Sequence, residues 1–77
     1  MNNLQIHFIW CGSDCSKIIE NLLIPKIISL KYFFKNSGYH LSFNLWLDRP
    51  ISNATISNMN YKLNETINVR DIFNLFS

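Results

Sequence analysis

The residues near the start of the chain with the most reactive side chains are one histidine and two cysteines. His7, Cys11 and Cys15 form the spacing H-x3-C-x3-C, and the sequence holds no other cysteine. Zinc knuckles and thiol oxidoreductases use C-x2-C instead, and these three side chains would share a face only on one continuous helix. The sequence therefore predicts reduced structural thiols, a structural His7 and no metal site, with a strained local disulfide as the less favoured alternative.

The carboxylates that could hold a metal ion are scattered along the chain. Asp14, Asp48 and Asp71 each stand alone, and no Asp-x-Asp pair occurs. Asp48 ends an apolar run and precedes Arg49-Pro50, a combination typical of a turn. We therefore interpret Asp48 as a turn former first and as a candidate binding residue second.

One tryptophan stands where open α/β sheets commonly bind their ligands, at the carboxyl end of a strand. The alternation over residues 4–10 predicts that strand, with Trp10 as its last residue and Gly12 in the loop that follows. One face carries Leu4, Ile6, Phe8 and Trp10, and the other carries His7 and Ile9. A tryptophan at this place either stacks on a planar ligand or packs in the core, and the residue type alone favours the core.

The elements that must position these residues alternate along the chain. We expect strands over residues 4–10, 41–47 and 65–69, and helices over residues 17–23, from Pro25 to about Phe34, and over residues 52–60. Pro25 either separates the first two helices or kinks a single one. Gly38 is the expected left-handed cap of the second helix. The apolar stripe that faces the sheet from these first two helices should consist of Leu23, Ile27, Leu30 and Phe34. A terminal amphipathic turn should span residues 71–76.

This order predicts an α/β fold, because alternating strands and helices imply right-handed crossovers and a parallel sheet. Parallel sheets are usually buried on both faces. A chain of 77 residues has too little material to cover three such strands twice. We therefore expect one unit, residues 1–77, that forms the incomplete, Rossmann-like start of a larger domain, with its first strand buried.

Composition and charge exclude several classes of protein. The chain is 48% hydrophobic and 16% charged, which argues against disorder. The formal net charge is only +2, and the basic residues are scattered, so nucleic-acid binding is not expected. Charged residues and Pro25 interrupt the most apolar segment, residues 18–34, so we expect no transmembrane segment. No signal peptide is recognised, which favours a cytoplasmic location or delivery into a host cell as an effector.

Two segments resemble a known family. They are Ile6-His7-Phe8-Ile9-Trp10-Cys11-Gly12 and Tyr39-His40-Leu41-Ser42-Phe43-Asn44-Leu45-Trp46-Leu47-Asp48. Together they resemble the first two strands of the glycosyltransferases that carry a D-x-D motif, especially the large clostridial-type glucosylating toxins and related bacterial effectors. Residues 68–72 resemble that family's third strand. The resemblance implies a GT-A domain that binds a UDP-sugar with a divalent ion, Mn²⁺ or Mg²⁺.

The resemblance also implies roles for individual residues. Trp10 corresponds to a tryptophan that stacks on uracil, the backbone of Ile9 and Cys11 would meet the base edge, and Gly12 would turn the chain beside the nucleotide. Asp48 would lie at the same sheet edge. The D-x-D that would hold the metal is absent from these 77 residues, so we expect no catalytic residue, no metal ligand and no cofactor in this chain alone.

Three hypotheses follow. The leading one is the N-terminal fragment of a toxin-type or effector-type glycosyltransferase, inactive alone, with weak or lost affinity for UDP-sugar and a protein acceptor only in the complete enzyme. The second is a small protein-interaction module that docks through a sheet edge and the apolar residues 72–76. The third is an independently folding binding domain without enzyme ancestry.

Overall fold

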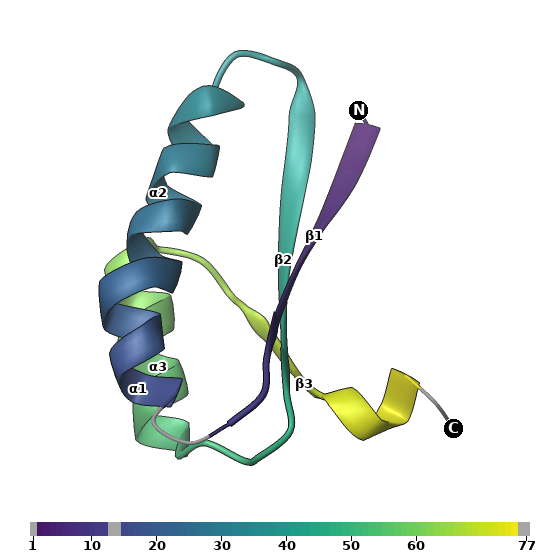
Figure 1. Ribbon diagram of the computed structural model, residues 1–77. Helices are drawn as coiled ribbons and strands as arrows, with labels where there is room; N and C mark the ends of the chain where they lie inside the picture. The colour runs from purple at the N-terminus through teal and green to yellow at the C-terminus, as the bar shows by residue number, and fades with distance from the viewer. Residues whose placement is uncertain (1, 13–14, 76–77) are drawn as a thin grey trace.

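Three parallel strands alternate with helices in the computed structural model, which describes residues 2–12 and 15–75 (Figure 1). The elements are β1 (Asn2–Trp10), α1 (Cys15–Ile18), η1 (Ile19–Leu23), α2 (Ile24–Phe33), β2 (Tyr39–Leu47), α3 (Asn53–Leu63), β3 (Asn68–Asp71) and η2 (Ile72–Leu75). The predicted α/β class and the three-strand parallel sheet are confirmed.

The strands follow the order β1-β2-β3, and their register brings the carboxyl ends together. Trp10 pairs with Leu47, and Leu47 pairs with Asp71. These three residues are the last of their strands. All three strands therefore stop at one level, and the loops that follow them start from the same edge of the sheet.

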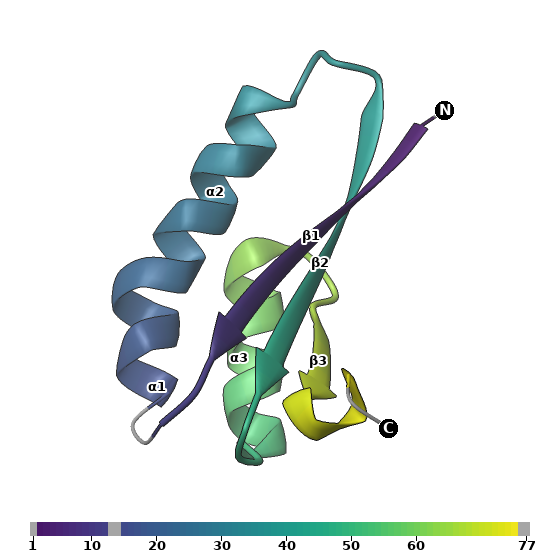
Figure 2. The ribbon, with the colours of Figure 1, turned by 45° about the vertical axis from the view of Figure 1, so that its right-hand side comes forward.

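The helices α1, η1, α2 and α3 cover one face of this sheet, and η2 follows the end of β3 (Figures 1 and 2). Phe43, Leu45 and Leu47 of β2 are buried on that face against the helices. Their helical partners are Ile19, Leu23, Ile24, Ile27, Met59 and Leu63. This apolar layer is the core, since burying one such side chain contributes about 1.5–3 kcal/mol.

The other face is not covered by α1, η1, α2 or α3 (Figures 1 and 2), as expected of a chain too short to cover its sheet twice, and the expectation that the first strand is buried holds on one side only. In β1 the side chains alternate between half-buried and exposed, Trp10 being half-buried and Ile9 60% exposed. The predicted face assignment is thus confirmed, but the strand is covered on one side only. The reason is chemical: the open-face residues of β2 include Ser42 and Asn44, which do not require an apolar cover.

Pro25 neither breaks nor sharply ends the helical segment, which runs without interruption from Cys15 to Phe33. The turn before the proline widens into the π-helical η1, in which the Ile24 N–H donates to the Ile19 carbonyl. Proline then occupies the first turn of α2, where its missing N–H costs least. No described helix has both the length and the apolar character needed to cross a membrane.

The far end of α2 differs from the prediction. The helix stops at Phe33, with Phe34 as its cap, so Gly38 is not the capping residue. Gly38 instead has φ +81° in the turn before β2, where a residue with a side chain is strained. Of the predicted stripe, Leu23 and Ile27 are buried, while Leu30 packs at the border of the core and Phe34 is half-buried.

The third strand starts later than the sequence predicts. The helix expected over residues 52–60 runs to Leu63, and Asn64 ends it in the left-handed conformation, with φ 52°. The Glu65 N–H still donates to the Asn60 carbonyl, and the Ile67 N–H donates to the Asn60 side chain at 3.0 Å. Residues 64–67 therefore belong to the helix cap, and the strand begins only at Asn68.

Candidate functional site

At the edge where the three strands end, one carboxylate joins the first two strands. The Gly12 N–H, just after β1, donates to both oxygens of Asp48, just after β2, at 3.1 Å each. Arg49 lies beside the same carboxylate, with its Nε 3.8 Å from Oδ2. Asp48 is thus more than a turn former, because it ties the loop after β1 to the end of β2.

The backbone conformation at position 12 requires a glycine. Its φ is +129°, which side-chain-bearing residues rarely adopt, although a Cβ would meet no atom within 4 Å. The constraint is therefore conformational and not steric. The glycine lets the chain leave β1 and present its N–H to Asp48.

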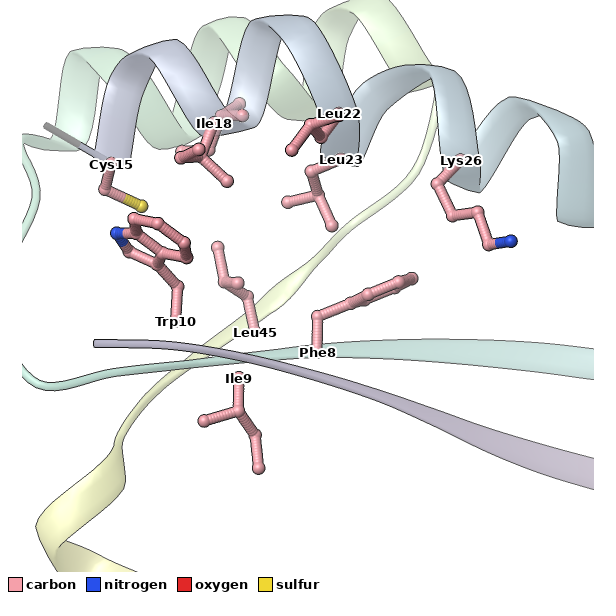
Figure 3. Close-up of a pocket in the computed structure, with 10 residues that line it drawn as sticks. Phe8, Ile9, Trp10, Cys15, Ile18, Leu22, Leu23, Lys26 and Leu45 are labelled. Atoms are coloured by element: carbon pink, nitrogen blue, oxygen red, sulfur yellow. The ribbon is translucent and has the colours of Figure 1, made fainter. Parts of the chain in front are cut away.

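Trp10 lies on the helix-covered side of this edge. Its indole points toward α1 and lies beside Cys15 and Ile18 (Figure 3). The residue packs at the border of the core and is half-buried. Its Nε1–H is buried and has no acceptor among the described residues. Trp10 therefore packs against the border of the core and also lines an apolar cavity between β1 and the helices.

The other two predicted residues of the site do not join Trp10 through their side chains. Ile9 points to the opposite side of β1 (Figure 3), and the side chain of Cys11 is exposed. Only their backbone groups lie at the strand end beside Trp10 and Gly12. The structure thus brings together Trp10, Gly12 and Asp48, with Ile9 and Cys11 present as main chain.

The two thiols have different surroundings. Cys11 is exposed, whereas Cys15 is half-buried against the core; neither is in a disulfide in the structure. Burial, reinforced by the negative charge of Asp48, raises the pKa of the Cys15 thiol above its ordinary value of 9.0. Cys15 is thereby kept as a neutral thiol, which is a poor nucleophile and a poor metal ligand.

A cavity of about 380 Å³ lies beside Asp48 between the ends of β2 and β3. Its walls are formed by residues 47–51, Ile56 of α3 and residues 69–71. Asp71 stands at its rim, but one of its oxygens accepts the Phe73 N–H at 2.9 Å. This hollow is large enough for part of a small polar ligand.

The described residues do not fit a divalent metal ion. No three of their His, Cys, Asp or Glu side chains come close enough to share one. The two carboxylates at the strand ends already bind main-chain N–H groups, Asp48 that of Gly12 and Asp71 that of Phe73. The Mn²⁺ or Mg²⁺ that the family resemblance implies therefore has no ligand set among these residues.

The open face of the sheet carries a polar cluster that sequence reasoning missed. Asn44, only 1% exposed, donates to Gln5 at 3.0 Å and to the Ile6 carbonyl at 3.2 Å, and accepts from the Arg70 Nε at 3.1 Å. Asn68 approaches the same oxygen. The signal was present in the sequence, because Ser42, Asn44 and Trp46 alternate with the apolar residues of β2.

A row of rings and charge crosses this open face. The Trp46 Nε1–H donates to Nδ1 of His7 at 3.0 Å. The guanidinium of Arg70 lies over the Trp46 ring, 5.6 Å from its centroid, at cation–π distance. His7 and Trp46 therefore have partners within the sheet face and lie away from the strand-end site.

The chain was also compared with known protein families, curated proteins and solved structures, and no match was found.

Proposed function

We propose that this chain is the start of a GT-A nucleotide-sugar-binding domain and that its strand-end edge takes the uridine part of a UDP-sugar. The observation that carries the proposal is the common ending of the three parallel strands, where the Gly12 N–H is held by Asp48. Open parallel sheets bind ligands outside the carboxyl ends of their strands. The motif resemblance assigns the base-stacking tryptophan to Trp10, which ends β1 at this edge.

Each group at this edge has a defined part in such binding. Trp10 is half-buried, and its indole is assigned as the stacking surface for the base, an interaction worth about 1–3 kcal/mol in nucleic-acid binders. Main-chain groups of Ile9 and Cys11 offer hydrogen bonds to the base edge. The cavity between the ends of β2 and β3, lined by Asp48 and Arg49, is assigned to the ribose.

The proposal covers binding and not sugar transfer. The chain has no D-x-D, and its strand-end carboxylates hold main-chain N–H groups. We therefore expect the isolated chain to bind UDP weakly, near millimolar affinity or about −4 kcal/mol, and to turn over no UDP-glucose. Delivery to a host cell and a protein acceptor belong to the same proposal and rest on the family resemblance alone.

Ligand-observed NMR with uridine and UDP tests this proposal. Trp10→Phe should retain part of the binding and Trp10→Ala should lose it, because only phenylalanine keeps a stacking ring. Trp46→Phe is the matched control, since it changes the other tryptophan on the open face. Circular dichroism establishes that each variant is folded. Equal binding by the wild type and Trp10→Ala would assign Trp10 to the core and end the proposal.

One observation favours the alternative of a small protein-interaction module. Phe73, in the segment that the alternative uses for docking, is 64% exposed. A folded wild-type chain that binds neither uridine nor UDP would favour this alternative over the nucleotide site.

A further inference from the structure

The end of α2 and the start of β2 carry an aromatic tip, which consists of Tyr32, Phe33, Phe34, Lys35 and Tyr39. Tyr32 is 79% exposed, Phe33 is 78% exposed and Tyr39 is 44% exposed. Phe34 anchors two of these rings, because its own ring meets those of Phe33 and Tyr39 edge to face, with centroids 5.1 Å and 6.0 Å away. The described part of the chain therefore leaves a packed group of rings exposed at this end.

The outer side of α2 leads into the aromatic tip and is apolar as well. Ile28 lies one turn before Tyr32 and is 53% exposed. The side of α2 that faces the sheet carries the buried Ile24 and Ile27. A helix at the surface of a domain is usually polar on the side away from the core, whereas a helix that is apolar all round is usually covered on every side. The composition of α2 thus indicates that its outer side has a partner.

Charge indicates the kind of partner that fits. Residues 21–47, which include all of α2 and β2, contain no Asp or Glu. Of the lysines in this segment, Lys31 is engaged within the fold, with its Nζ 3.1 Å from Glu65. Lys26 and Lys35 are exposed and form no ion pair with a described residue. The apolar outer side of α2 therefore has a free positive charge near each end and no negative charge of its own.

We propose that the aromatic tip and the outer side of α2 dock on the surface of an anionic phospholipid bilayer. Tyr32 and Phe33 enter the interfacial region, where aromatic rings are favoured. Lys35 meets the anionic headgroups and keeps its apolar stem on the membrane side of the helix. The turn after α2 projects at one end of the molecule (Figures 1 and 2), so this end can reach a flat surface.

A bilayer fits this surface better than a nucleic acid or an acidic protein does. Binding of a nucleic acid requires clustered basic residues, and Lys35 is the one free lysine of the aromatic tip. An acidic protein would need an apolar hollow that matches the projecting rings. The interface of a bilayer receives such rings without a preformed hollow and offers negative charge beside them.

This inference is independent of the proposed nucleotide site. The strand β2 starts at Tyr39, in the aromatic tip, and runs away from it toward the strand ends (Figure 2). Docking through the aromatic tip therefore leaves Trp10 and Gly12 open to a ligand. The two proposals also have separate measurements, since one predicts binding of UDP and the other predicts binding of vesicles.

Vesicle co-sedimentation of the 77-residue chain tests the proposal. Vesicles of phosphatidylcholine alone are compared with vesicles that also contain phosphatidylserine. The wild type should bind the phosphatidylserine vesicles about tenfold more tightly, because each free lysine gains from the negative surface. The double variant Tyr32→Ser/Phe33→Ser should weaken this binding about tenfold or more, since it removes both exposed rings. Lys35→Glu should weaken it about fivefold or more.

Tyr61→Ser is the matched control, because Tyr61 is 86% exposed on α3, and it should bind vesicles as the wild type does. Circular dichroism shows whether each variant is folded, and Lys35→Glu changes no ion pair of the described fold. Equal binding to both kinds of vesicle, or a folded double variant that binds like Tyr61→Ser, would overturn the proposal.

The other possible occupants of the aromatic tip give different results in the same experiment. A folded wild type that binds neither kind of vesicle would assign the aromatic tip to a protein partner and overturn the proposal. Self-association without vesicles that the double variant Tyr32→Ser/Phe33→Ser loses would assign it to a second copy of the chain and also overturn the proposal.

Discussion

The two faces of the sheet remove the side chains of β2 from water in different ways. On the helix side, Phe43, Leu45 and Leu47 are removed from water by apolar helices. On the open side, the same strand places Asn44 at 1% exposure, and none of the helices α1, η1, α2 and α3 covers it (Figure 1). Neighbouring polar side chains cover Asn44 and satisfy its amide. A short parallel sheet can therefore remain open on one face when that face forms its own hydrogen-bonded layer.

Of the substitutions that test this comparison, one in the apolar core should cause the largest loss of stability. Ile27 is fully buried, and its truncation to alanine should lower the free energy of unfolding by about 2–5 kcal/mol, since it leaves a cavity. A total stability of about 5–15 kcal/mol makes this a severe loss. Urea denaturation followed by circular dichroism measures it.

The neighbouring residue provides the matched control. Ile28 is of the same type in the same helix but is 53% exposed, so Ile28→Ala should cost much less. Similar losses for the two variants would mean that the helix does not face the sheet as described.

The polar layer should show an intermediate effect. Asn44→Leu removes the shared partner of Gln5 and Arg70, and we expect a loss of about 1–3 kcal/mol in the free energy of unfolding. Ser42→Ala is the control on the same face, because Ser42 is half-buried and its side chain has no hydrogen-bond partner among the described residues. It should change stability by under about 0.5 kcal/mol. A stabilised Asn44→Leu chain would show that the open face prefers an apolar cover.

The smallest effect concerns the thiol at the border between the core and the strand ends. Because the pKa of Cys15 is raised in the folded state, its thiolate is disfavoured there. Iodoacetamide at about pH 8 should therefore modify the exposed Cys11 first, and denaturant should remove much of the difference. Peptide mass spectrometry at timed intervals measures both rates.

The same shift has a consequence for stability. A thiol whose pKa is raised by folding stabilises the fold below its unfolded value, and this contribution is lost as the pH rises through the folded value. Stability should thus decline slightly above about pH 9, and Cys15→Ser should remove that part of the decline. Equal alkylation rates for Cys11 and Cys15 in the folded chain would contradict the burial of Cys15.

Much of the fold could be predicted because local patterns specify it. The alternation in β1 and β2 identified which residues face the helices, and the helical spacing of Leu23 and Ile27 identified the core stripe. The start of β3 could not be predicted from the sequence. Ile67 is a buried β-branched residue, as is typical of a strand, but its N–H is bound by Asn60 in the cap of α3. The π-helical turn η1 could not be predicted either, since Pro25 is compatible with a break, a kink or a π turn.

The candidate site was accessible to sequence reasoning only in part. The ends of parallel strands can be located from their apolar runs, which placed Trp10 and Asp48 at one edge. The contact between Gly12 and Asp48 joins residues 36 positions apart, and it depends on a strand register that no local pattern gives. The hydrogen bonds of Asn44 reach both neighbouring strands, and predicting them also requires the strand register.

The most direct test of the nucleotide site is a titration of the isotopically labelled chain with UDP, followed through its backbone amide resonances. The account predicts shifts concentrated at the strand ends, on the amides of Trp10, Gly12 and Asp48, because these lie around the proposed base and ribose. The amides of Gln5 and Asn44, whose side chains lie on the open face away from the strand ends, should stay unchanged at the same UDP concentration. Shifts concentrated on the open face, or no shifts in a folded chain at millimolar UDP, would contradict the account.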